Sequence, residues 1–185
     1  MAANAFIRFL KNKKPVTLGE SMQKGHMYTD GWLEIGDWSW DITADTNFLK
    51  GTGASVGKAV PGAMSFSHSF DRSSPLILDH ITMGTHFDVA QIDMLKQTGE
   101  SQPQVYFQVM MGSVFITKVS SKGGEDGAIA QDVEMVFKEI QIGYKKQSSN
   151  IKSGKAGKLD PAVPFKWNIS HMTFTVDDEI KLLIS

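Results

Sequence analysis

Residues 64–87, MSFSHSFDRSSPLILDHITMGTHF, constrain the fold more than any other stretch, because they combine a strand, a short helix and a second strand. Large side chains alternate with serines at the start of this stretch, at Met64, Phe66, His68 and Phe70. A period of two places these side chains on one face of a β-strand. The stretch therefore begins as a strand that turns one face toward a core.

A short helix is predicted next, over about residues 74–83. Three side chains before it could accept hydrogen bonds from the free amides of a first helical turn: Asp71, Ser73 and Ser74. Pro75 suits the first helical position, where its missing N–H costs nothing, and Gly84 can adopt the left-handed conformation that ends a helix. No other segment carries so complete a set of signals, so we expect a single helix lying across one end of a β-fold.

The segments before this unit also predict strands. Residues 5–10 form the first, and residues 31–42, GWLEIGDWSWDI, form a strong second candidate. The apolar phase of the second switches at Gly36, which indicates a β-bulge or bend. Three tryptophans lie close together here: Trp32, Trp38 and Trp40. We interpret them as core packing, with a subunit interface as the alternative.

Three further stretches alternate as strands: residues 105–119, 129–144 and 163–169. We expect a break or bulge at Gly112 in the first. A slip at Lys138–Glu139 in the second indicates a bulge or a strand that passes from one sheet to another. Residues 120–127 predict a polar loop. Residues 47–61, NFLKGTGASVGKAVP, show no usable period and predict a loop long enough to be functional.

This succession of strands, with turns between them and one helix, predicts a mainly β fold, a β-barrel or sandwich. The repeated phase slips favour the barrel, because bulges help strands to curve. The chain has 185 residues and neither an internal repeat nor a clear linker. We therefore expect a single domain over residues 1–185, with a core at about 5–170 and a tail, residues 171–185, that adds a strand or a short helix.

Charge and composition exclude several classes of function. A formal net charge of −1 indicates neither a nucleic-acid partner nor an anionic membrane, and no run approaches the roughly 20 apolar residues of a membrane span. The chain has no cysteine, which excludes disulfides and thiolate metal sites. The N-terminal apolar run is interrupted by Arg8 and lacks the core of a signal peptide, so the expected starting compartment is the cytoplasm.

No catalytic constellation emerges from the sequence. Residues 53–57, GASVG, match the nucleophile elbow of hydrolases around Ser55, but that motif requires a buried strand before it and a helix after it. Residues 51–58 depart from phosphate-loop spacing, and Ala59 replaces the hydroxyl that would hold magnesium. The five histidines form no close pair with metal-ligand spacing. We predict no catalytic residue, no cofactor and no metal.

Four segments resemble, in order, the Hcp family, the hemolysin-coregulated proteins that form the inner tube of the bacterial type VI secretion system. They are GWLEIGDWSWD with its Trp-Ser-Trp core, residues 66–84 with the Asp71…Ser74-Pro75-Leu76 element, residues 123–144 with a glycine turn and a strand ending in tyrosine, and FKWNI at residues 165–169. The departures from the family pattern are a longer loop at residues 145–164 and the tail.

The resemblance implies a two-sheet barrel with one helix that assembles as a homohexameric ring, with rings stacked into a tube. It implies a non-enzymatic protein whose partners are itself, the spike and sheath proteins, and effector cargo in the ring lumen. The protein would lie in the bacterial cytoplasm before firing and then be secreted without a signal peptide. By family analogy, six residues of the 47–61 loop are candidates for ring stacking or subunit contact: Asn47, Phe48, Leu49, Lys50, Val56 and Lys58.

Other interpretations remain open at this point. The 47–61 segment could be an ordinary surface loop. A β-barrel could also hold a small apolar ligand, in which case the protein should be monomeric. A hydrolase built on Ser55 and a phage-like tail-tube protein are the remaining alternatives.

Overall fold

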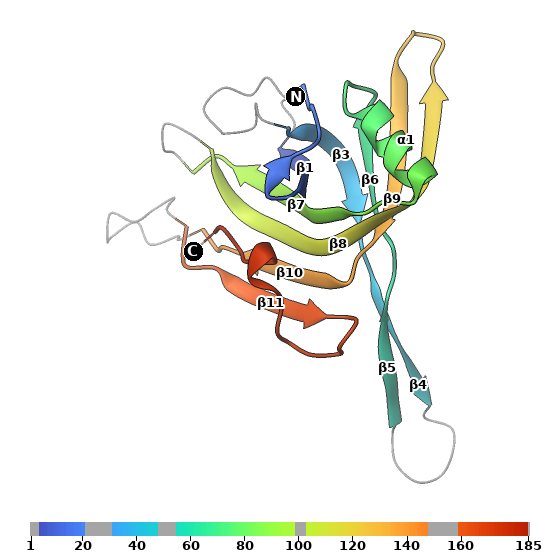
Figure 1. The fold of residues 1–185 in the computed structure, drawn as a ribbon. Helices are drawn as coiled ribbons and strands as arrows, with labels where there is room; N and C mark the ends of the chain where they lie inside the picture. The colour runs from blue at the N-terminus through green and yellow to red at the C-terminus, as the bar shows by residue number, and fades with distance from the viewer. Residues whose placement is uncertain (1–3, 21–30, 48–54, 99–102, 148–158, 185) are drawn as a thin grey trace.

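The structure, a computed structural model, describes residues 4–20, 31–47, 55–98, 103–147 and 159–184 (Figure 1). Its elements in chain order are β1 (Ala5–Lys11), β2 (Lys14–Pro15), β3 (Leu33–Ser39), β4 (Ile42–Asn47), β5 (Ser55–Pro61), β6 (Met64–Ser69), α1 (Ser74–Met83), β7 (Phe87–Lys96), β8 (Gln104–Gly123), β9 (Ile129–Val136), β10 (Glu139–Tyr144), β11 (Val163–Asn168) and the 3₁₀ helix η2 (Asp178–Ile180). The predicted mainly β fold with one short α-helix at residues 74–83 is confirmed.

Six strands close into a barrel in the order β8–β7–β1–β3–β6–β9, because β9 pairs back onto β8. All pairings around this ring are antiparallel. Strands β10 and β11 extend the sheet outward from β8, and β4 and β5 form a separate two-stranded sheet (Figure 1). Closure leaves no free strand edge within the barrel.

The 20-residue strand β8 makes this arrangement possible. Along one edge it pairs first with β10, where Gly112 faces Glu139, and then with β9, where Phe115 faces Val136. Since the register is continuous across the junction, β9 and β10 behave as one strand interrupted at residues 137–138. The predicted discontinuity at Lys138–Glu139 coincides with this interruption, but the chain neither bulges there nor passes to another sheet, because both strands stay paired with β8. The chain leaves the barrel here, and the neighbour on the other side changes from β6 to β11.

Two details of β8 differ from expectation. Gly112 keeps its register with Val89, and the irregular backbone lies at the next residue, Ser113, whose φ is 51°. The glycine serves packing instead, because a Cβ at residue 112 would lie 3.1 Å from Ile180 Cγ2. Residues 120–123, predicted to be loop, belong to β8 and pair with β9. Their side chains are all exposed, so no hydrophobic period marks them as strand.

Large apolar side chains fill the barrel. The ring of Phe9 lies 4.5 Å from that of Phe87 and 6.2 Å from that of Phe66, centroid to centroid. Ile77 brings α1 into the same cluster and is fully buried there. Other fully buried members are Ile7, Leu33, Met64, Ile92, Met111 and Met135. The interior is therefore a packed core.

The helix boundaries follow the predicted signals at the C-terminus more closely than at the N-terminus. Gly84 is left-handed (φ 65°), and the Thr85 amide donates to the His80 carbonyl at 3.1 Å. Ser73 is the N-cap, but its side chain accepts no hydrogen bond from a helical amide. Asp71 Oδ1 accepts from the Ser73 amide at 2.8 Å, and Ser74 Oγ accepts from the Asp71 amide at 3.0 Å. These hydroxyl and carboxylate groups thus fix the turn before the helix rather than its first turn.

The tryptophans pack as predicted for a core. Trp32 is buried with Phe6, and Trp38 and Trp40 are partly buried against the main cluster. The predicted bulge near Gly36 is confirmed as a shift in register between β3 and β6 from Ile35 to Trp38. The segment is not one strand, however, since β3 ends at Ser39 and β4 begins at Ile42.

Candidate interaction surfaces

The β4–β5 hairpin projects away from the barrel (Figure 1). Its strands pair from Ile42–Pro61 at the base to Asn47–Ser55 near the tip. The prediction that residues 47–61 form an unstructured loop is therefore wrong for residues 55–61, which are a strand. No period reveals this strand because, of residues 57–61, only Ala59 packs against the core, and Val60 and its neighbour Ile42 on β4 are 57% and 42% exposed.

Three of the predicted contact residues lie on this hairpin. Asn47 ends β4, Val56 pairs with Thr46, and Lys58 is exposed on β5. The other three, Phe48, Leu49 and Lys50, lie outside the described residues. The family-based assignment of these six residues stays a prediction.

The base of the hairpin is held by Trp40 and Gly62. Trp40 Nε1 donates to the Gly62 carbonyl at 3.2 Å, and the Gly62 amide donates to the Asp41 carbonyl at 2.9 Å. A Cβ at residue 62 would collide with the Asp41 carboxylate, so a larger residue here would force the Asp41 side chain to move. The Trp40 ring lies 5.8 Å from that of Phe137. The hairpin direction is therefore tied to the barrel core.

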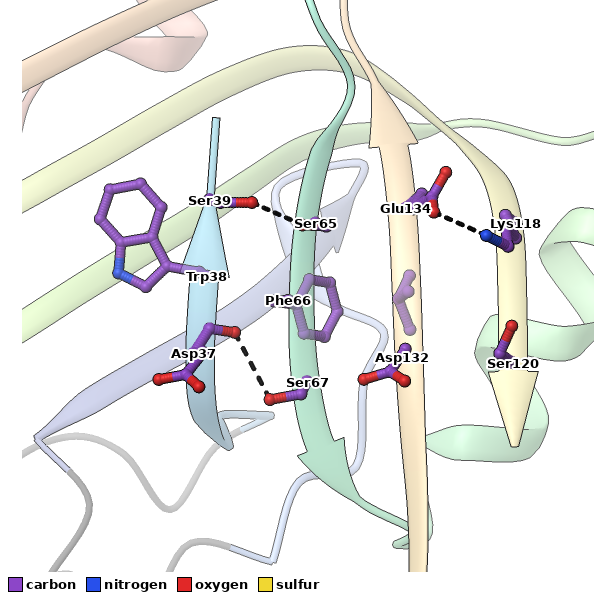
Figure 2. A pocket seen from close by; sticks show the side chains of 11 residues that line it. Asp37, Trp38, Ser39, Ser65, Phe66, Ser67, Lys118, Ser120, Asp132 and Glu134 are labelled. Atoms are coloured by element: carbon purple, nitrogen blue, oxygen red, sulfur yellow. Dashed lines mark hydrogen bonds and ion pairs between the residues drawn. The ribbon is translucent and has the colours of Figure 1, made fainter. Parts of the chain in front are cut away.

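A polar groove of about 420 Å³ crosses the outer face of β3, β6, β9 and β8 (Figure 2). One row across it runs Ser39, Ser65, Glu134, Lys118, with Ser39 Oγ and Ser65 Oγ 2.8 Å apart and Lys118 Nζ 2.9 Å from Glu134 Oε1. A second row runs Asp37, Ser67, Asp132, Ser120 (Figure 2). The ion pair between Lys118 and Glu134 is exposed, so it adds little stability. The groove as a whole presents mainly hydroxyl and carboxylate groups to solvent.

In the part of the chain that the structure describes, no side-chain arrangement supports the catalytic alternatives. Ser55 opens β5, which leads into β6 and not into a helix, so the context of a nucleophile elbow is missing. His68 Nε2 lies 2.9 Å from Gln131 Oε1, and His80 Nδ1 lies 2.8 Å from the Leu76 carbonyl. Within the described ranges, no three His, Asp or Glu side chains are placed to hold a metal ion.

The described part of the chain contains no helix of the length and hydrophobicity that crossing a bilayer requires.

A buried polar relay lies on the outer face of β1, β7 and β8. Arg8 donates two hydrogen bonds to Gln91 Oε1, at 2.8 and 3.0 Å. Gln91 Nε2 donates to both oxygens of Asp93, and Gln108 Nε2 donates to Asp93 Oδ1 at 2.8 Å. Burial raises the pKa of Asp93, against the opposing effects of the two glutamines and of the Arg8 charge.

The C-terminal tail covers this relay. Gln108 Oε1 accepts the Leu183 amide at 2.7 Å, and Gln141 Oε1 accepts the Leu182 amide at 3.3 Å. Ile180 at the end of η2 is 1% exposed and packs with Val89 and Met110. The tail thus supplies a short 3₁₀ helix, one of the two forms expected for it, and lies on the outer face of β7, β8 and β10.

The opposite face of β10 and β11 is apolar and becomes exposed away from the barrel. Partners across antiparallel strands share a face, so three rows can be followed from β8 through β10 to β11. They are Met111–Ile140–Trp167, Val109–Ile142–Phe165 and Phe107–Tyr144–Val163. The first row is buried, whereas Phe165, Tyr144 and Val163 are 39%, 48% and 72% exposed. We call β10 and β11 the flap, and Phe107, Ile142, Tyr144, Val163 and Phe165 the flap face.

The sequence did not reveal the flap face. Val163, Phe165 and Trp167 alternate as they would in a core strand, and only Trp167 is buried. Trp38 also contributes, since its ring stacks on Phe107 at 5.6 Å between centroids.

Comparisons with known proteins agree with the fold. The sequence model of the family described as "Type VI secretion system effector, Hcp" matches residues 9–146. Protein hcp1 of Pseudomonas aeruginosa is 28% identical over 171 residues, which cover 91% of this chain and 96% of that protein.

Solved structures share the fold over nearly their whole length. One, described as a type six secretion system protein, has a TM-score of 0.76 at 19% identity and covers 93% of this chain and 99% of its own. Hcp1 from Salmonella typhimurium has a TM-score of 0.68 at 22% identity, with 94% and 99% covered. The family match spans most of the barrel strands and the helix, and the chain belongs to the Hcp family of type VI secretion system tube proteins.

Proposed function

We propose that this chain is a non-enzymatic building block that forms homohexameric rings, which stack into the inner tube of the secretion system. The β4–β5 hairpin carries this proposal. A two-stranded hairpin alone is marginally stable in water. This one projects from the barrel with Ile42 and Val60 exposed, so docking on another subunit would bury apolar surface that the isolated chain leaves in water.

The partners follow from this role. The tube would lie within sheath proteins and end at a spike complex, and sheath contraction would export it from the bacterial cytoplasm without a signal peptide. Effector cargo would travel in the ring lumen. A polar surface such as the groove across β3, β6, β9 and β8 suits a water-filled lumen better than a subunit contact, because its serines and carboxylates would lose hydration on burial.

The packed interior counts against the small-ligand alternative. Phe9, Phe66 and Phe87 occupy the space that a carrier barrel would leave for its ligand. The phage-like tail-tube alternative shares the assembly logic, but the family match is to the type VI secretion system.

Sedimentation velocity combined with negative-stain microscopy tests the proposal. Wild-type protein should sediment as a closed oligomer and show rings, and stacked rings should appear at high concentration. A particle with the mass of one 20.4 kDa chain at every concentration would contradict it.

A further inference from the structure

The two faces of the flap differ in what covers them, since the C-terminal tail packs on the outer face and leaves the flap face exposed. Its outer face carries Glu139, Gln141 and Gly143 on β10, and the tail is docked against them. A Cβ at residue 143 would lie 2.7 Å from Leu182 Cδ1 and 3.1 Å from Ile184 Cδ1. The glycine therefore leaves room for the tail to lie close against the sheet.

Hydrogen bonds fix the tail in this position. Glu139 Oε1 accepts from Asn168 Nδ2 at 2.5 Å, and its Oε2 accepts from the Asp177 amide at 2.9 Å. Together with the contacts of Gln108 and Gln141, these hydrogen bonds hold the tail against the outer face of the flap. The chain's own C-terminal segment is thus unable to cover the flap face as well.

The flap face is continuous with the barrel core. The row Met111–Ile140–Trp167 belongs to the main buried cluster, and Phe107 and Ile142 pack against its edge. Exposure then rises toward the corner where Tyr144 pairs with Val163. Contiguous apolar surface of this kind on a braced sheet is typical of a protein interface and does not enclose a small ligand.

We propose that the flap face is the surface through which neighbouring subunits of the ring pack, and that its occupant is a second copy of this chain. This inference rests on the proposed function and deepens it, since it names the contact surface. In a tube protein another copy is the partner present at every subunit, and a net charge of −1 opposes self-association weakly. In a closed ring each interface joins two different surfaces, so the flap face supplies one side of every contact.

Substitutions on the two sides of β11 provide a matched test. Val163→Asp and Phe165→Asp place a charge on the flap face, whereas Lys166→Asp changes an exposed residue of the opposite face of the same strand. Phe174→Asp removes a 77% exposed aromatic ring outside the flap. Far-UV circular dichroism and thermal unfolding establish that each variant is folded, and sedimentation velocity over a dilution series gives its assembly state.

We expect the flap-face variants to require at least about tenfold more protein to form rings. Each replaces an apolar side chain of the proposed interface with a carboxylate, which would lose its hydration on burial. Lys166→Asp and Phe174→Asp should form rings as the wild type does. If wild-type rings form and both flap-face variants form them equally well, the inference is overturned while the proposed function stands. If the wild type forms no rings at all, both the inference and the proposed function are contradicted.

A labelling experiment covers the case in which an aspartate variant does not fold. The chain has no cysteine, so Val163→Cys and Phe174→Cys each introduce a single thiol. The thiol at residue 163 should react with a maleimide at least about tenfold more slowly in rings than in dilute subunits, because burial blocks access to the thiolate. The thiol at residue 174 should react at the same rate in both. Equal rates at residue 163 would overturn the inference.

Discussion

Asp93 accepts a hydrogen bond from Gln108 Nε2 at 2.8 Å, and this contact decides which way the Gln108 amide points. With Nε2 directed at the carboxylate, Gln108 Oε1 is left facing the tail, where it accepts the Leu183 amide at 2.7 Å. A buried acid on β7 therefore orients the group that holds the C-terminus. The barrel and its tail are linked through one glutamine.

The buried carboxyl group predicts a pH dependence of stability. Desolvation raises the pKa of Asp93 above its ordinary value of 3.8, so the folded state holds this proton more tightly than the unfolded state does. The stabilising contribution is then fully present below the ordinary pKa and is lost as the pH rises through the folded-state value. In urea titrations, wild type should lose stability relative to Asp93→Asn as the pH rises through this window. A difference that is constant, or that grows in favour of wild type, would contradict this account.

The glycine under the tail predicts a local effect. Gly143→Val should push Leu182 and Ile184 off the sheet, because the added atoms occupy their place. Amide hydrogen exchange in the last residues of the tail should rise by at least about tenfold, which reports local opening without loss of the barrel. Gly123→Val is the matched control, since a Cβ there meets nothing within 4 Å. Equal exchange in both variants would show that the tail does not depend on this contact.

The helix terminus predicts a change in global stability. Gly84 has a φ of 65° and open space around its Cα, so Gly84→Ala adds strain but no clash. We expect a loss of about 1 kcal/mol in the free energy of unfolding, and a smaller loss for Gly84→Asn, because asparagine tolerates the left-handed conformation better. Urea unfolding measures both. If alanine proves as stable as glycine, the left-handed cap is not a constraint in solution.

The projecting hairpin predicts a defect in assembly alone. Ile42→Ser combined with Val60→Ser should leave the unfolding midpoint of the subunit nearly unchanged, because both side chains are largely exposed. Tube length in electron micrographs should fall, since the docking surface of the hairpin is reduced. Ile129→Ser, at a 49% exposed position on β9, serves as the control. Tubes of unchanged length in the double variant would remove the hairpin from the stacking contact.

Sequence reasoning succeeded where one face of an element is buried and its local chemistry is specific. The helix at Ser74–Met83 follows from Pro75 and Gly84 and was placed at its observed bounds. The phase changes near Gly36 and at Lys138–Glu139 identified real discontinuities, because a strand that changes partner or bulges also changes the face it buries.

The errors have one physical origin. Residues 55–61 and 120–123 are strands without an alternating buried face, since residues 120–123 are exposed and Ala59 is the one residue of 57–61 that packs on the core. For the flap face the prediction errs in the other direction. Val163 and Phe165 alternate as core residues do, but they are not buried in the subunit. Periodicity reports which residues avoid water, and a surface intended for a second molecule carries the same signal as a core.

The central claim is that the subunit buries its exposed flap face against another copy of the same chain. Maleimide labelling of Val163→Cys, measured on rings purified by sedimentation and on the same protein after dilution, tests it most directly. The account predicts slow reaction in rings of six 20.4 kDa chains and fast reaction in free subunits. Fast reaction in intact rings would contradict it.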